Sequence, residues 1–232
     1  PSNTVVVYTS VDDVFARPVC EQFQKQTGVE VKLVPDTEET KSTGLLNRLI
    51  AEKARPQADV FWSGDPVRAA VLKAKGISAP FKPASPADTT GRFSDPEGHW
   101  SALSARARVI IYNRASVNPA EVQNYEDLAH PRLRGKLCVR SGAHPYNLSL
   151  GSALIHHLGE QKTEEWARGL VANFARTPKG GDTDQIRAVA LGECQVGLTN
   201  SYYVARLMRS AKPEDRKAME KLGVVWPNQQ SF

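Results

Sequence analysis

The sequence is poor in the residues that build most familiar metal and redox sites. It contains three cysteines, Cys20, Cys138 and Cys194, and only two methionines. The cysteines show none of the short spacings of zinc or iron–sulfur ligands, so the sequence contains no recognisable motif for a cysteine-bound metal. Two of the three could form a disulfide, which would leave one free thiol.

Long hydrophobic runs are also missing. No stretch approaches the roughly 20 apolar residues of a membrane-spanning helix. Hydrophobic residues make up 41% of the 232 positions and charged residues 24%, as in an ordinary soluble globular protein. The chain lacks an initiator methionine as well, and from Pro1 it enters a strand almost at once. This looks like a mature, processed N-terminus and predicts an extracytoplasmic location.

The basic residues are not gathered into one patch. Lys and Arg number 30 against 25 Asp and Glu, for a net charge of +5, and the densest group is Arg132, Arg134, Lys136 and Arg140. A nucleic-acid surface would cluster its cations among aromatic residues, so we expect no nucleic-acid partner. A solvated protein surface accounts for this charge. The same basic surface could also favour an anionic ligand or an anionic membrane partner.

Strands and helices alternate through most of the chain, without an internal repeat. The first half predicts strands over 4–8, 29–34 and 58–62 and helices over 12–27, 40–53 and 66–75. A proline-rich loop over 78–98 precedes a long strand over 101–113. The second half predicts strands over 136–140, 195–199 and 224–226 and helices over 147–158, 163–173, 182–191, 201–209 and 213–222. This is the pattern of two α/β lobes.

Ligands in open α/β sheets bind at the carboxyl ends of strands, beside helix N-termini. Two of the predicted strand ends lead into tyrosines, namely Tyr146 and the pair Tyr202-Tyr203. Alternatively, one tyrosine of the pair could pack in the core while the other covers the surface. A free phenol has a pKa near 10, but a hard trivalent cation can displace its proton and bind the phenolate oxygen. Three phenolates would balance the charge of Fe³⁺.

Several segments resemble the ferric-iron-binding periplasmic proteins of ABC transporters, and the resemblance runs along essentially the whole chain. The segments that carry it are Val5–Phe15, Asn47–Lys53, Gln57–Trp62, Ala105–Tyr112, Cys138–Ser141 with Tyr146-Asn147, Gly180–Ile186 and Asn200–Tyr203.

The resemblance implies a type II periplasmic-binding-protein fold, with two α/β lobes joined by crossing hinge strands. Residues 1–103 would form the first lobe, 104–225 the second, and 226–232 would return toward the first. Compared with the family, the chain lacks the C-terminal segments that complete the first lobe. Tyr146, Tyr202 and Tyr203 match the family's phenolate ligands of Fe(III) in the interlobe cleft. Arg106 matches an arginine that holds a synergistic carbonate, with Arg108 as the alternative.

The first lobe departs from the family pattern. Many relatives offer a histidine after the first strand and a glutamate after the third, where this sequence has Asp12 and Asp65. Each aspartate could bind the metal or cap a helix. Tyr8 is a further candidate that could instead complete its strand. Carbonate or water would fill the positions left open.

Cys138 and Cys194 each lie at a strand of the second lobe, and neighbouring parallel strands could bring them within bonding reach. An exported protein tolerates such a bond. We therefore expect a disulfide between these two residues and a buried free thiol at Cys20.

The predicted function is capture of Fe(III) by a monomeric solute-binding protein that delivers it to an ABC permease. One alternative is a protein of the same fold that binds an oxyanion or a phosphonate. An enzyme of this fold is the other alternative, but the sequence shows no Ser/His/Asp set and no glycine-rich phosphate loop. We expect the Gly180-Gly181-Asp182 segment to open a helix instead.

Overall fold

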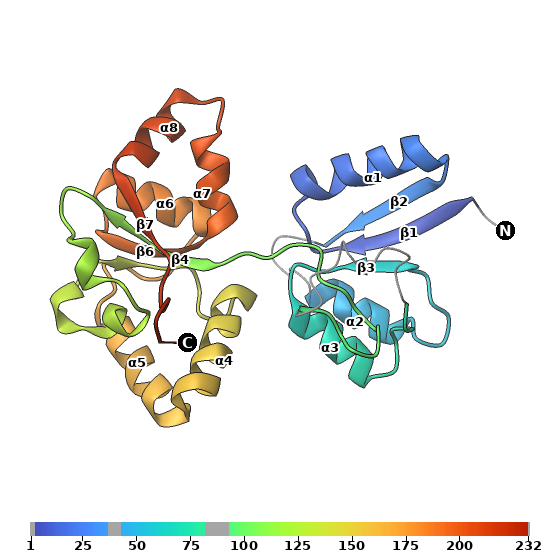
Figure 1. Ribbon diagram of the computed structural model, residues 1–232, viewed down its shortest axis with the longest axis horizontal. Coiled ribbons are helices and arrows are strands. Elements are labelled where there is room, and N and C mark those ends of the chain that lie inside the picture. Colours follow the sequence, from blue (N-terminus) through green and yellow to red (C-terminus); the bar gives the residue numbers. More distant parts are fainter. Residues whose placement is uncertain (1–2, 37–42, 82–92, 232) are drawn as a thin grey trace. The chain divides into compact units, whose positions relative to one another are not determined.

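The computed structural model describes residues 3–36, 43–81 and 93–231. The chain divides into two compact units, a first unit up to Ala105 and a second unit from Arg106 onward (Figure 1). This boundary lies two residues after the expected lobe boundary at residue 103.

The first unit is a three-stranded parallel sheet in the order β2-β1-β3. Its elements are β1 (Thr4–Thr9), α1 (Asp13–Thr27), β2 (Glu30–Pro35), α2 (Thr43–Ala51), β3 (Val60–Trp62) and α3 (Pro66–Ala74). Helix α1 lies on one face of the sheet, and α2 and α3 lie on the other (Figure 1). Gly28 ends α1 in the left-handed conformation, with φ of 72°. Residues 40–42 of the predicted second helix and 82–92 of the proline-rich loop lie outside the described residues.

The apolar face of helix α1 is largely exposed. The apolar stripe of α1, formed by Val14, Phe15, Val19 and Phe23, is between 40% and 62% exposed, and Ala16 is the buried residue of the helix. The described part of the sheet beneath has three strands, two of them with six residues, and offers a small surface to pack against. In the opposite layer Leu45, Leu46 and Leu72 are buried.

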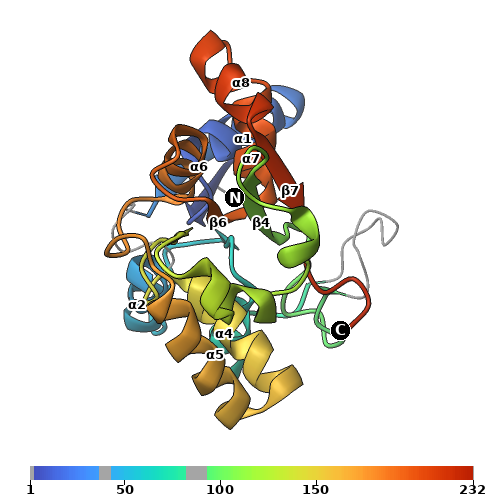
Figure 2. The ribbon, with the colours of Figure 1, turned by 90° about the vertical axis from the view of Figure 1, so that its left-hand side faces the viewer.

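The second unit is a mixed four-stranded sheet in the order β5-β6-β4-β7. Its strands are β4 (Arg108–Asn113), β5 (Leu137–Cys138), β6 (Val196–Asn200) and β7 (Leu222–Val225). Its helices are η3 (Pro119–Glu121), η4 (Glu126–Ala129), η5 (Pro131–Leu133), α4 (Pro145–Leu158), α5 (Glu160–Ala172), α6 (Asp182–Leu191), α7 (Ser201–Met208) and α8 (Pro213–Glu220). Helices α6, α7 and α8 cover one face of the sheet, and α4 and α5 cover the other (Figures 1 and 2).

Both faces of this sheet are buried, which explains the continuous apolar run in β4. Val109 and Ile111 point into the core beneath α6 and α7, while Ile110 points into the core beneath α4 and the 3-10 helices. All three side chains are fully buried. The second unit therefore has two packed layers that hold the strand ends in place.

The central strand is shorter than the sequence predicts, since β4 begins at Arg108 and not at residue 101. Its partner β6 ends opposite Arg108 at Asn200 and turns into α7, so earlier residues have no ladder to join. The expected return of residues 226–232 toward the first lobe stays a prediction. Asn228 packs against the second unit, where its side chain accepts from the Tyr125 amide at 2.9 Å and donates to Glu126 at 2.8 Å.

Candidate metal centre

The tyrosines of the second unit lie at one edge of its sheet. Strands β5 and β6 are parallel, so their carboxyl ends point the same way, and antiparallel β4 begins at the same edge with Arg108 opposite Asn200. Tyr146 is the second residue of α4, and Tyr202 and Tyr203 are the second and third residues of α7. Helix N-termini carry partial positive charge and favour negatively charged oxygens.

The three phenols form one cluster. The hydroxyl oxygens of Tyr146 and Tyr202 lie 3.0 Å apart and share a hydrogen bond. The Tyr202 and Tyr203 rings lie with centroids 4.2 Å apart at an interplanar angle of 32°. Two oxygens bound to adjacent corners of an octahedral hard cation at about 2.0–2.1 Å would lie about 2.9 Å apart. The structure thus brings the three tyrosines together, and the spacing of the Tyr146 and Tyr202 oxygens suits a shared cation.

Burial controls the protonation of the central phenol. It raises the pKa of Tyr202 far above its ordinary value, and the neighbouring Tyr146 and Tyr203 raise it further through charge repulsion and hydrogen bonding. Without a cation the Tyr202 phenol is therefore protonated. A bound cation reverses this balance, because its charge stabilises phenolate oxygen.

Three guanidinium groups surround the Tyr146 ring. The central carbons of Arg106, Arg108 and Arg140 lie 5.1, 5.8 and 5.0 Å from the ring centroid. Arg106 precedes β4 and is exposed, whereas Arg140 is only 7% exposed. Burial lowers the pKa of the Arg108 guanidinium, an effect that Asp182 opposes by pairing with it. The expected anion-binding residue Arg106 is thus the solvent-accessible cation of the three.

A buried polar network lies next to the phenols, and of its members the sequence analysis assigned only Arg108 to the site, as the alternative anion-binding residue. Asp182, the first residue of α6, pairs with Arg108 at 2.5 Å and with Arg140 at 3.3 Å. Asn200 donates its backbone N–H to the same carboxylate at 2.7 Å. In the sequence, only the position of these residues at the end of a strand or the start of a helix could have pointed to the network. Several unrelated polar residues occupy similar positions, so this feature does not single them out.

The first-unit candidates have other partners in the structure. Tyr8 is 1% exposed and donates its hydroxyl hydrogen to the Glu52 carboxylate, whose oxygens lie 3.0 and 3.2 Å away. Asp65 caps α3 by accepting from the Val67 amide at 2.9 Å. Asp12 occupies the N-cap position of α1, and its backbone carbonyl accepts the first amides of that helix. Tyr8 and Asp65 therefore stabilise the first unit.

The expected disulfide is confirmed. Cys138 and Cys194 are joined, with a Cα–Cα distance of 5.8 Å, and both are buried. Cys138 ends β5 and Cys194 lies two residues before β6, so the bond links the two strands that lead to Tyr146 and to the Tyr202-Tyr203 pair. Cys20 is free, as expected, but it is half-buried instead of fully buried.

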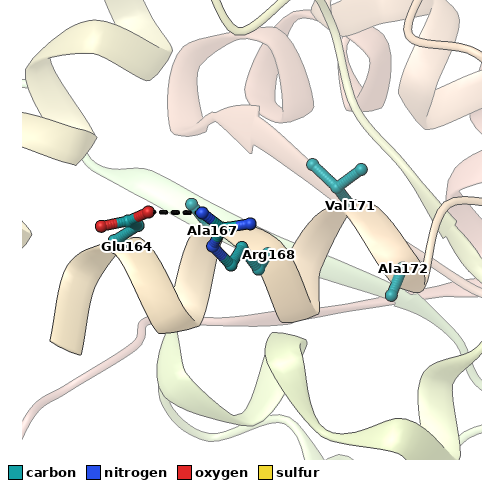
Figure 3. A pocket seen from close by; sticks show the side chains of 5 residues that line it. All are labelled: Glu164, Ala167, Arg168, Val171 and Ala172. Carbon is teal, nitrogen blue, oxygen red and sulfur yellow. Dashed lines mark hydrogen bonds and ion pairs between the residues drawn. The ribbon is translucent and has the colours of Figure 1, made fainter. Parts of the chain in front are cut away.

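Other features of the described residues offer no comparable site. Within residues 3–36, 43–81 and 93–231, no group of three or more His, Cys, Asp and Glu side chains could hold a metal. A surface hollow on α5 is lined by Glu164, Ala167, Arg168, Val171 and Ala172 (Figure 3). Its two charged residues pair with each other at 2.6 Å. A helix suited to crossing a bilayer is also missing from the part of the chain that the structure describes.

Comparison with known proteins places the chain in a family. Residues 55–231 match the model of the family described as bacterial extracellular solute-binding protein. The chain belongs to this family. Iron uptake protein A1 of Synechocystis is 37% identical over 224 residues, which cover 96% of this chain and 60% of that protein. The Fe(3+)-binding periplasmic protein of Serratia marcescens is 27% identical over 201 residues, which cover 86% of this chain and 57% of that protein.

Solved structures confirm the type II periplasmic-binding-protein fold for this solute-binding protein. The ferric binding protein of Campylobacter jejuni superimposes with a TM-score of 0.91 at 30% identity, over 98% of this chain and 71% of that one. A Trichodesmium protein, IdiA (FutA), in complex with iron and citrate ligands superimposes with a TM-score of 0.85 at 39% identity, with the same coverage. This chain thus spans about 60% of the length of the curated relatives that it matches. The named relatives are binding and uptake proteins.

Proposed function

We propose that this solute-binding protein captures Fe(III) through the phenolate oxygens of Tyr146, Tyr202 and Tyr203. The observation that carries the proposal is the 3.0 Å approach of the Tyr146 and Tyr202 hydroxyl oxygens, with the Tyr203 ring beside them. Phenolate is a hard oxygen donor, and three phenolates neutralise the charge of a trivalent cation. The iron-related names of the matched relatives support the same ligand.

Binding would proceed by exchange of protons for the metal. The half-buried Tyr202 phenol holds its proton until Fe³⁺ arrives, and the cation then displaces it. The N-termini of α4 and α7 stabilise the phenolate oxygens that form. Coordination positions that the tyrosines leave open would be filled by water or by a small anion such as carbonate. Arg106, exposed and 5.1 Å from the Tyr146 ring, is our candidate to hold that anion. Asp12 remains a candidate ligand from the first unit, and it ranks ahead of the hydrogen-bonded Tyr8.

The setting of this function is the extracytoplasmic space. Family membership supports a role in delivering bound solute to an ABC permease, and we expect the binding protein to act as a monomer and not as an enzyme. A protein of this fold that binds an oxyanion or a phosphonate would leave the phenol cluster without a role.

The test is a titration of the purified, iron-stripped protein with ferric citrate, followed by visible absorbance with and without bicarbonate. Phenolate-to-Fe(III) charge transfer should give a visible band that grows to one equivalent. A requirement for bicarbonate would support Arg106 as an anion ligand. A protein that develops no band, and whose intrinsic fluorescence does not change, would contradict iron capture by these tyrosines.

A further inference from the structure

Asp182 connects three strand ends of the second unit through one carboxylate. Its side chain is fully buried, and it is the first residue of α6. One oxygen accepts from Arg108 Nη1 at 2.5 Å and from the Asn200 backbone N–H at 2.7 Å. The other accepts from Arg140 Nη1 at 3.3 Å. Arg108 begins β4, Asn200 ends β6, and Arg140 follows β5.

Each of these partners leads directly to a tyrosine of the cluster. Asn200 is the N-cap residue of α7, so its position fixes where this helix starts and thereby places Tyr202 and Tyr203. The Arg140 guanidinium lies 5.0 Å from the Tyr146 ring centroid. Arg108 donates from Nη2 to the side-chain oxygen of Asn147 at 2.9 Å, one residue beyond Tyr146.

Capping of α6 does not account for Asp182, because another residue performs that task. Asp184 accepts from the Gly181 amide at 2.7 Å at the start of the helix. Asp182 instead points toward two buried guanidiniums, both of which keep an Nε without a hydrogen-bond partner among the described residues. Arg140 donates to the Asp182 carboxylate, so its orientation depends on that residue. Arg108 donates to Asp182 and also to the side-chain oxygens of Asn147 and Asn200.

We propose that Asp182 is the positioning residue of the tyrosine site, which holds Tyr146 in register with Tyr202 and Tyr203 without touching the metal. The inference rests on the proposed function, because it assigns a role toward the same iron-binding phenols. A buried carboxylate with three donors fixes geometry, since loss of one partner leaves buried charge uncompensated. Metal sites depend on such outer contacts, whose loss typically weakens binding 10–100-fold.

The experiment compares Asp182→Asn with Asp215→Asn. Asp215 is a matched control, because it is also a buried aspartate of the second unit that pairs with an arginine, Arg187 at 3.0 Å. All six tyrosines are labelled as 3-fluorotyrosine, and their fluorine resonances are assigned with single Tyr→Phe variants. Spectra of the iron-free proteins are recorded first, followed by titration with ferric citrate.

We expect Asp182→Asn to shift or broaden the Tyr146, Tyr202 and Tyr203 resonances, and Asp215→Asn to leave them in place. Iron affinity should fall at least about tenfold in Asp182→Asn, with a displaced charge-transfer band, and change less than about twofold in Asp215→Asn. Unchanged tyrosine resonances in a folded Asp182→Asn protein would overturn the inference. Because the fluorine spectra need no iron, they test Asp182 even if the wild-type protein develops no band.

A second variant keeps the test decisive if Asp182→Asn does not fold. Arg140→Gln leaves Asp182 paired with Arg108 and removes the nearer of the two network guanidiniums from the Tyr146 ring. The Tyr146 resonance should then move more than those of Tyr202, its hydrogen-bond partner, and Tyr203. Equal movement of all three, or of none, would contradict the proposed linkage.

Discussion

At the scale of single residues, Tyr202 is the centre of the proposed site. Its hydroxyl contacts that of Tyr146, its ring lies against Tyr203, and burial keeps it protonated in the absence of a cation. In this environment the ionised phenolate is unfavourable in the absence of a cation. A trivalent cation that replaces the proton strongly stabilises the phenolate.

Tyr202→Phe should therefore lower iron affinity by more than about 100-fold, because loss of outer-shell contacts alone costs 10–100-fold. The variant should remain folded, since each hydrogen bond that the hydroxyl makes contributes only about 1 kcal/mol. Tyr112→Phe is the control, because Tyr112 lies in β4 outside the phenol cluster. Affinity is measured by competition with citrate. Equal affinities of the two variants would remove Tyr202 from the site.

Tyr125 provides a separate test through alkaline pH. Burial raises the pKa of Tyr125 to about 12, against a lowering by Arg108, and its hydroxyl donates to the Arg108 carbonyl at 2.5 Å. The unfolded phenol ionises near pH 10. Between about pH 10 and 12 the unfolded state therefore loses this proton first, and stability that is fully present below pH 10 is lost as pH rises.

The expected loss from Tyr125 is about 2–3 kcal/mol between pH 10 and 12, at 1.36 kcal/mol for each pKa unit. Urea unfolding of the wild-type protein and of Tyr125→Phe across this range isolates the contribution. The variant should be less stable at pH 8 and lose less stability on going to pH 12. Parallel pH profiles would show that Tyr125 ionises alike in both states.

At the scale of elements, the disulfide ties together the two strands that deliver the tyrosines. Cys138 and Cys194 are 56 residues apart, so the bond closes a long loop of the unfolded chain. The chain-entropy model gives about 4 kcal/mol for a loop of this length. The double variant Cys138→Ser, Cys194→Ser should lose about 2–4 kcal/mol of unfolding free energy in urea. It should also bind iron more weakly, because β5 and β6 hold the site. A loss below about 0.5 kcal/mol would contradict this account.

In the first unit, we expect substitutions in the exposed apolar face of α1 to cost much less stability than substitutions in the buried face of α2. Phe23 is 45% exposed, so Phe23→Ser should change the unfolding free energy by less than about 1 kcal/mol. Leu46 of α2 is 6% exposed, and Leu46→Ala should cost about 2–5 kcal/mol. Thermal or urea unfolding compares the two. A cost for Phe23→Ser as large as that for Leu46→Ala would show that α1 buries its apolar face in solution.

At the scale of the whole molecule, the order of elements was predictable and their contacts were less so. Alternating strands and helices predicted two α/β units, and β-branched runs located the strands within one or two residues. The start of β4 was missed because strand length depends on where its partner β6 ends, which the residues of β4 do not encode. The exposure of the α1 stripe could not be predicted, because periodicity marks an apolar face without showing what covers it.

The same distinction applies to the site. The three tyrosines were selected by their position at strand ends and by family resemblance, and the structure brings them together. The network around Asp182 depends on contacts 42, 74 and 18 residues apart in sequence, which no local pattern reveals. Tyr8 and Asp65 were plausible ligands by position, but Glu52 and the N-terminus of α3 are their partners in the structure.

The central claim is that Fe(III) is bound by tyrosine phenolates, and resonance Raman spectroscopy of the iron-loaded protein tests it most directly. Excitation within the visible band should enhance ring vibrations of iron-bound phenolate. Those vibrations should weaken in Tyr146→Phe, Tyr202→Phe and Tyr203→Phe and be unchanged in Tyr112→Phe. A protein that binds one equivalent of iron with no phenolate vibrations, or with vibrations that survive all three site variants, would contradict the account.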